Sequence, residues 1–171
     1  YESSHAREIR PVPPSDRPLP ELIAELNALT GMDEAKNAIT QQVERLQVNR
    51  LRADAGLVSA PISMHMMFVG KPGTGKTTVA RLVASIYKSA GLLGNGNLIE
   101  VDRSGLVGQY LGSTVRRTGE VLDQARGGVL LVDEAYGLIS GDTDMFGREA
   151  LDALIKGMED HRDDLVVILT G

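Results

Sequence analysis

Residues 70–77 constrain this chain more than any other stretch, because they read GKPGTGKT and match the pattern G-x-x-x-x-G-K-[ST]. The apolar run MHMMFV leads into them, and the helix-forming run KTTVARLVASIY begins within them. Glycines let the backbone amides of such a turn point inward around a phosphate chain, and the helix start adds unpaired amides and a positive dipole end. A glycine-rich turn that binds nothing is the alternative, which the strand before it and the helix after it disfavour. The sequence therefore predicts a phosphate loop for a nucleotide.

The residue types in this loop predict separate roles. Lys76 is expected to reach the β and γ phosphates and so to take part in catalysis, while the hydroxyl of Thr77 is expected to ligate magnesium. Thr78 is expected to add a contact near the α phosphate. A side chain at Gly73 or Gly75 would stand in the way of the phosphates. The predicted nucleotide contacts of the loop are Pro72, Gly73, Thr74, Gly75, Lys76, Thr77 and Thr78.

The second motif is the run GVLLVDEAY, in which four apolar residues lead to Asp133 and Glu134. A carboxylate at the end of a buried strand is costly unless it serves a cation, so Asp133 is predicted to hold magnesium, directly or through water. Glu134 can deprotonate and orient a water for attack on the γ phosphate. On its own, such a run is usually a strand that meets a solvated loop. Beside the phosphate loop, it predicts hydrolysis of the γ phosphate of the bound nucleotide and not its transfer to a metabolite.

A third stretch, LVGQYLGST, places Tyr110 and Leu111 between two glycines. The residues alone leave two interpretations of Tyr110 open. The ring either packs against its own domain or lies on an exposed binding loop.

The rest of the chain from position 64 alternates between apolar strand patterns and helical patterns. Expected strands cover residues 64–70, 97–102, 128–134 and 165–170, and expected helices cover 76–90, 113–125 and 147–159. Continuous apolar strands interleaved with helices predict an α/β fold with a parallel sheet that is covered on both faces. Two further helices are expected before it, over residues 21–29 and from Asp33 onward. We expect Asp33 to cap the second of these and Lys36 to lie outside its apolar stripe.

Composition narrows the class of protein. Five of the seven prolines lie in residues 1–20, which are therefore expected to form an extended linker. A net charge of -5 and a pI of about 5.2 argue against binding to nucleic acid or to an acidic membrane surface. The chain has no cysteine, no apolar run long enough to span a bilayer and no signal-peptide core, so a cytoplasmic protein without membrane insertion is expected. The three histidines lack ligand spacing, and no metal other than magnesium is predicted.

Five segments resemble, in the same order, one branch of the AAA+ ATPases. They read LTGMDEAK, GKPGTGKTTVARLVASIYKSAGLL, EVDRSGLVGQYLGST, GGVLLVDEAYGL and FGREALDALIKGMEDHRDDLVVIL. The branch contains red-type Rubisco activase, stage V sporulation protein K and the cytosolic ATPase of type VII secretion. The resemblance implies a P-loop NTPase three-layer sandwich, with residues 21–171 as the AAA+ nucleotide-binding α/β subdomain. It also implies a ring, usually a homo-hexamer, that uses ATP and magnesium to thread or pull a protein partner.

The resemblance also implies roles for particular residues. The loop that matches YLG lines the central pore of such rings, so Tyr110 and Leu111 are expected to grip the substrate. The segment that contains Gly31 and Met32 is similar to the one that cups adenine in relatives.

This chain departs from the family pattern at its C-terminal end. It ends where the fourth core strand of the family delivers its sensor residue, so Thr170 stands at or next to that position. We expect the subdomain to lack the fifth strand, the arginine finger and the helical lid in this chain. Without the fifth strand, residues 64–69 are expected at a sheet edge.

Two rival functions remain open at this point. One is a nucleotide-dependent assembly or regulatory module that does no threading. The other is a DNA-acting AAA+ motor, which the acidic pI and the aromatic pore candidate make the less favoured of the two.

Overall fold

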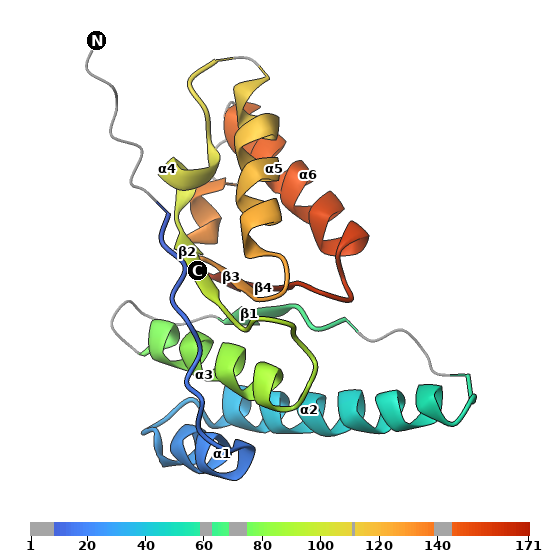
Figure 1. Cartoon of the computed structure of the whole chain (residues 1–171). Helices are drawn as coiled ribbons and strands as arrows, with labels where there is room; N and C mark the ends of the chain where they lie inside the picture. Colours follow the sequence, from blue (N-terminus) through green and yellow to red (C-terminus); the bar gives the residue numbers. More distant parts are fainter. Residues whose placement is uncertain (1–8, 59–62, 69–74, 111, 139–144) are drawn as a thin grey trace.

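The computed structural model of the chain describes residues 9–58, 63–68, 75–110, 112–138 and 145–171. Its centre is a parallel four-stranded sheet in the order β1-β4-β3-β2 (Figure 1). The strands are β1 (Met66–Phe68), β2 (Leu98–Val101), β3 (Val129–Val132) and β4 (Val166–Thr170). The predicted parallel sheet is thereby confirmed, and each expected strand is present at somewhat shorter length.

Helices cover both faces of this sheet. One layer is formed by α1 (Leu19–Ala28), α2 (Asp33–Asp54) and α3 (Lys76–Ser89), and the other by α5 (Ser113–Ala125) and α6 (Met145–Asp160) (Figure 1). The short helices α4 (Arg103–Leu106) and η1 (Ala135–Leu138) follow β2 and β3 directly. The result is the three-layer sandwich that the sequence predicted. Within the described residues, no helix combines the length and apolarity needed to cross a membrane.

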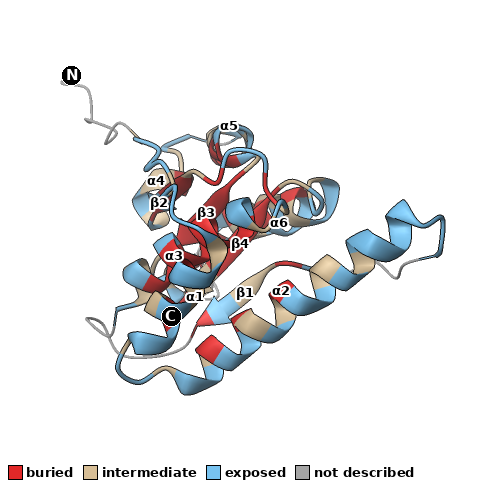
Figure 2. Cartoon of the chain, turned by 60° about the horizontal axis from the view of Figure 1, so that its bottom comes forward, coloured by how far each residue is buried: buried red, intermediate tan, exposed pale blue. Residues whose placement is uncertain are grey.

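Strand β3 shows why a continuous apolar run folds here. All four of its residues are buried, and alternate side chains enter different cores. Val129 and Leu131 pack with α1, α2 and α3, whereas Leu130 and Val132 pack with α5 and α6. A strand buried on both faces has no polar side, so its sequence shows no alternation. Figure 2 shows this burial concentrated in the strands and the helix faces against them.

Strand β1 lies at one edge of the sheet, as expected, and the side chain of Met67 is 65% exposed there. Strand β2 forms the other edge. Its first residue, Leu98, pairs in antiparallel fashion with Val12 from the proline-rich stretch. Residues 9–18, the part of that stretch that the structure describes before α1, lie against the domain instead of standing apart from it.

The start of α2 differs from the expectation in two respects. Asp33 is the first helical residue, and the N-cap is Met32, whose φ of 56° is left-handed and which makes no side-chain cap bond. Lys36 was expected outside the apolar stripe, yet it is 8% exposed. Its Nζ donates to the carbonyls of Asn27 (3.4 Å) and Leu29. The last carbonyls of a helix need donors, so Lys36 is buried because it caps the end of α1.

Candidate functional site

The predicted phosphate loop leads directly into α3. Gly75 is the N-cap of this helix, and its φ of 89° is a conformation that side chains rarely adopt. Glycine supplies no capping side chain, and the first turn of α3 carries no acidic residue. The first amides of α3 therefore have no side-chain partner from their cap, as an anion site requires. The loop residues Pro72, Gly73 and Thr74 lie outside the described part of the chain.

Lys76 is the first residue of α3 and points toward the end of the sheet. Its Nζ donates to the carbonyl of Gly171, the residue after β4, at 2.9 Å. This contact links the start of α3 to the carboxyl end of a strand 95 positions away. Thr77 is partly buried next to Lys76, whereas Thr78, in the same first turn, is exposed.

Asp133 follows β3 directly and lies at the same carboxyl-terminal end of the sheet. Its Oδ1 accepts the hydroxyl of Thr170 at 2.8 Å and the amide of Glu134 at 2.9 Å. Thr170 is 1% exposed and Asp133 is partly buried, so the first of these bonds is partly shielded from solvent. Lys76 and Asp133 thus meet the adjacent residues Thr170 and Gly171. The carboxyl ends of parallel strands lie at the same end of the sheet. Two motifs that are far apart in the sequence therefore converge there.

Glu134 has an unusual backbone conformation. Its φ of 54° is left-handed for a residue that is not glycine, a conformation that costs roughly 1–2 kcal/mol. The turn is secured on both sides, because the Glu134 amide donates to Asp133 and its carbonyl accepts the amide of Gly137 at 2.9 Å. Backbone strain of this kind clusters at functional sites. The Glu134 side chain is exposed, so solvent water reaches it.

Sequence reasoning missed one neighbour of this site. The ring of Tyr136, from η1, lies so close to Gly171 that a Cβ at that position would overlap ring carbons Cδ2 and Cε2. Tyr136 is 56% exposed, so its ring covers the end of β4 from the solvent side. A glycine directly after an apolar strand signals only the strand end. Nothing in the local sequence indicates that it lies under an aromatic ring or accepts from a lysine.

The structure answers one part of the open question about Tyr110, which is whether its ring packs in the core. Its side chain is 74% exposed, which rules out a core role for the ring. The backbone is fixed locally, because the Tyr110 amide donates to Oγ of Ser113 at 2.9 Å. The amide of Gly108 donates to the buried Oγ1 of Thr114 at 3.0 Å. The second predicted pore residue, Leu111, lies outside the described residues.

The predicted adenine residues lie in the turn between α1 and α2. Gly31 and Met32 both have left-handed backbone conformations, with φ of 78° and 56°. Met32 packs against the core that contains Val79 and Ala80 of α3. The turn therefore contacts the helix that carries Lys76 through apolar packing.

The model of the AAA family, the ATPase family associated with various cellular activities, matches residues 66–171. Stage V sporulation protein K of Bacillus subtilis is 44% identical over 153 residues, which cover 90% of this chain and 48% of that protein. The ESX-1 secretion system protein EccA1 of Mycobacterium tuberculosis is 45% identical over 159 residues, which cover 91% of this chain and 28% of that protein. The chain thus spans about half or less of the length of these relatives.

A solved structure shows the same fold. The FIGL-1 AAA domain, crystallised in complex with ADP, superposes with a TM-score of 0.57 at 22% sequence identity. The match covers 92% of this chain and 56% of that one.

Proposed function

Because this chain belongs to the AAA family of ATPases, we propose that it binds ATP with magnesium at the start of α3, hydrolyses it, and uses the energy to thread or pull a protein partner. The observation that carries the proposal is that Lys76 and Asp133 both bind residues at the carboxyl end of β4, which are Gly171 and Thr170. We propose residues 21–171 as the nucleotide-binding subdomain and residues 1–20 as the linker that leads into it, of which residues 9–18 lie against the subdomain.

The residues at this end of the sheet fit a nucleotide phosphate chain with a divalent cation. The amides of the first turn of α3 and the Nζ of Lys76 supply the positive potential that phosphates need. Asp133 and the hydroxyl of Thr77 supply oxygen ligands of the kind that magnesium prefers. Magnesium, when bound, would neutralise charge that develops on the phosphate oxygens.

Glu134 is the proposed general base. Its exposed carboxylate accepts a proton from a water molecule and orients that water for in-line attack. The Asp133 carboxylate accepts hydrogen bonds from the Glu134 amide and the Thr170 hydroxyl. These bonds fix the Asp133 side chain relative to the backbone of Glu134. Fixed geometry of this kind lowers the entropy cost of reaching the transition state.

Tyr110 is the proposed contact to the protein partner, together with Leu111. An exposed aromatic side chain on a loop with a fixed backbone provides a large contact area at low cost in conformational entropy. We propose that the full-length protein assembles as a homo-hexamer, in which such side chains from several copies face one pore. Gly31 and Met32 are the proposed adenine contacts. ATP supply makes the cytoplasm the proposed compartment.

The test is a titration of a fluorescent ATP analogue into the full-length wild type, into Lys76→Ala and into the control Lys88→Ala. Lys88 lies in the last turn of the same helix and is exposed. Loss of a charge-assisted contact worth roughly 1.5–3 kcal/mol weakens binding by about 10- to 150-fold. We expect that loss for Lys76→Ala and wild-type affinity for Lys88→Ala. Equal affinities for the two variants would contradict the assignment of the phosphate site.

A further inference from the structure

Residues 9–18 form a strap that crosses one edge of the sheet and joins the two helix layers. Ile9 packs against the core under α5 and α6, and the strap leads into α1, whose first residue, Leu19, packs against the core that contains α3. In Figure 1 this segment runs from the α4 side, past β2 and across α3, to α1. Both cores thus contact a single short segment of the chain.

The strap meets the sheet at one residue pair. The amide of Val12 donates to the carbonyl of Leu98 at 2.8 Å, and the amide of Leu98 donates to the carbonyl of Val12 at 2.8 Å. The flanking residues Pro11 and Pro13 have no amide hydrogen, so they cannot lengthen this pairing into a strand. The strap therefore touches the free edge of β2 at one point and then turns onto α3.

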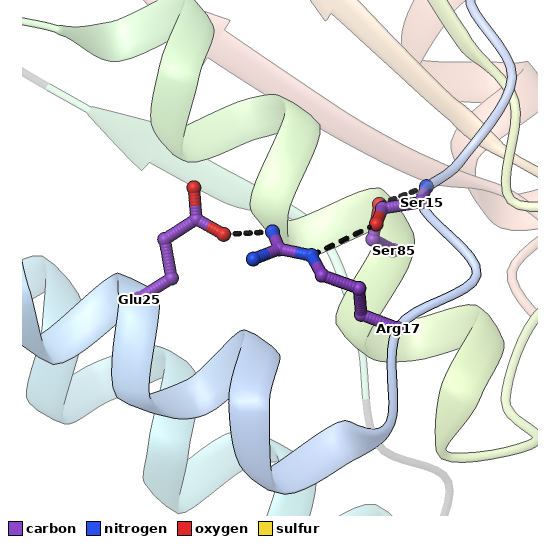
Figure 3. Close-up of polar contacts among 4 residues, drawn as sticks. All are labelled: Ser15, Arg17, Glu25 and Ser85. Atoms are coloured by element: carbon purple, nitrogen blue, oxygen red, sulfur yellow. Dashed lines mark hydrogen bonds and ion pairs between the residues drawn. The ribbon is translucent and has the colours of Figure 1, made fainter.

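The strap meets α3 at Ser85, a polar residue that is 5% exposed between apolar neighbours. The amide of Ser15 donates to Oγ of Ser85 at 3.0 Å, as Figure 3 shows. Arg17 then forms an ion pair with Glu25 of α1, and its Nε donates to Oγ of Ser15 at 3.1 Å. The ion pair is solvent-exposed, and such pairs add little. Among the contacts that the structure describes, the strap is held at separate points, at Val12, Ser15 and Arg17.

A groove of about 390 Å³ lies between the strap and α3. Its α3 wall includes Thr78, Arg81, Leu82 and Ser85. These positions follow helical spacing and form one stripe along α3. The stripe starts in the helix turn that also carries Lys76, and it ends at the residue that holds the strap. The open groove shows that the strap spans α3 without close packing along its length.

We propose that docking of the strap on α3 and binding of nucleotide at the start of α3 are coupled. The two events fix the same helix, so order gained at its first turn favours the strap-docked arrangement, and docking favours nucleotide. The prolines of the strap keep it extended when it is released, and this limits the entropy cost of docking again. By reciprocity, nucleotide must protect the strap by the factor by which the strap tightens nucleotide binding. The coupling rests on the nucleotide site proposed above.

The experiment uses the full-length protein and follows hydrogen exchange of the Val12 and Ser15 amides with and without a non-hydrolysable ATP analogue and magnesium. Couplings of this kind are typically at least about fivefold, and we expect exchange to slow by that factor or more when nucleotide is bound. Ser85→Ala removes the acceptor on α3 with little change of shape. It should speed exchange of both amides and weaken nucleotide binding by a similar factor.

Two further variants separate the strap from general destabilisation. Ser89→Ala makes the same change at an exposed position of the same helix and should alter neither quantity. Ser15→Pro removes the donor of the same bond, so the double variant Ser15→Pro, Ser85→Ala should bind nucleotide no more weakly than the weaker single variant. Additive losses would contradict the shared bond.

The outcomes distinguish this inference from the proposed function. Nucleotide binding with unchanged exchange of the strap amides would overturn the coupling and leave the nucleotide site standing. The coupling is likewise overturned if Ser85→Ala releases the strap while nucleotide affinity stays at the wild-type value. Failure of the wild type to bind nucleotide at all would overturn the proposed function, and the coupling with it.

Discussion

The end of β4 and the loop that carries Tyr110 are built in opposite ways. At the end of β4, the polar contacts join residues that are distant in sequence, Lys76 with Gly171 and Asp133 with Thr170. In the loop, contacts such as Tyr110 with Ser113 and Gly108 with Thr114 span three and six positions. Long-range contacts position a side chain relative to the whole domain, as catalysis requires. Local contacts set the shape of a loop and leave its outward side chain free to meet a partner.

This difference makes the two regions separable by mutation. Changes at the end of β4 should alter nucleotide binding and hydrolysis, because they disturb groups that share one geometry. Changes at Tyr110 should alter work on a protein partner and leave the nucleotide site intact. Substitutions with progressively smaller expected effects on the folded enzyme can test that separation.

Glu134→Gln should have the largest effect. The amide keeps the size of the side chain but cannot accept a proton from water, so hydrolysis should slow by at least about 100-fold. ATP and magnesium should still bind, because Asp133 and Lys76 are unchanged. Steady-state phosphate release and analogue titration in the full-length protein measure the two quantities. The control is Glu159→Gln, on the exposed end of α6, which should hydrolyse at the wild-type rate. A full rate for Glu134→Gln would place the base elsewhere.

Thr170→Val should have an intermediate effect. The substitution keeps the shape of a buried side chain but removes the hydroxyl that donates to Asp133. A hydrogen bond to a charged group is worth about 1.5 kcal/mol or more, so hydrolysis at limiting magnesium should fall roughly tenfold.

Thr118→Val is the matched control for this change. Thr118 is also fully buried, and its hydroxyl donates to the carbonyl of Leu106 at 3.1 Å. This control should lower the melting temperature while the hydrolysis rate per folded molecule stays unchanged. If the hydrolysis rate per folded molecule falls equally in both variants, the long-range bond between Thr170 and Asp133 has no special role in hydrolysis.

A variant of His65 can test whether every long-range contact on β4 affects nucleotide binding. Its Nδ1 accepts the amide of Val167 at 2.9 Å, so Nε2 carries the proton and donates to the carbonyl of Met158 at 2.9 Å. Burial lowers the pKa of His65 below its ordinary value of 6.5, although the bond to Met158 raises it in part. Below pH 6.5 the unfolded chain takes up the proton first, so the free energy of unfolding should fall as pH falls, until the native pKa is reached.

The size of this effect has an upper bound. One proton changes the free energy of unfolding by at most about 1.4 kcal/mol per pH unit. Denaturant unfolding of wild type and His65→Gln from about pH 7 to pH 5 measures it, with His161→Gln as the control in the turn after α6. The variant His65→Gln should lose part of the acid sensitivity, and His161→Gln should keep it. Nucleotide affinity at neutral pH should be nearly the same in all three proteins.

Prediction from sequence succeeded where the signal was local. The limits of α5 match the expected helix at residues 113–125, and α3 ends at Ser89, one residue before the expected end. Apolar periodicity and the phosphate-loop pattern carry this information within a few residues. The polar partners were not predictable in the same way. The burial of Lys36 depends on the end of α1, and the place of Gly171 depends on Lys76 and Tyr136. These contacts form only when distant elements pack.

Tyr110→Ala should have the smallest effect on the folded protein and so gives the sharpest test of the separation. With 74% of its side chain exposed, truncation removes little buried surface, and the free energy of unfolding should change by less than about 0.5 kcal/mol. A core tyrosine would instead leave a cavity and cost about 3 kcal/mol, a drop of several degrees in melting temperature. The matched control is Tyr136→Ala, because that exposed ring lies on Gly171. It should alter nucleotide-dependent stabilisation, which Tyr110→Ala should not.

The functional half of this test needs the full-length protein with a protein partner. Thermal unfolding with and without ATP is measured beside a partner-remodelling or partner-stimulated ATPase assay. We expect Tyr110→Ala to keep its melting temperature, nucleotide affinity and ring assembly while it loses remodelling. A stable variant that remodels its partner at the wild-type rate would show that Tyr110 has no part in threading. That result would favour the alternative of an assembly module controlled by nucleotide alone. A variant that melts several degrees early would show that the local contacts of this loop do support the fold, and the contrast between the two regions would then fail.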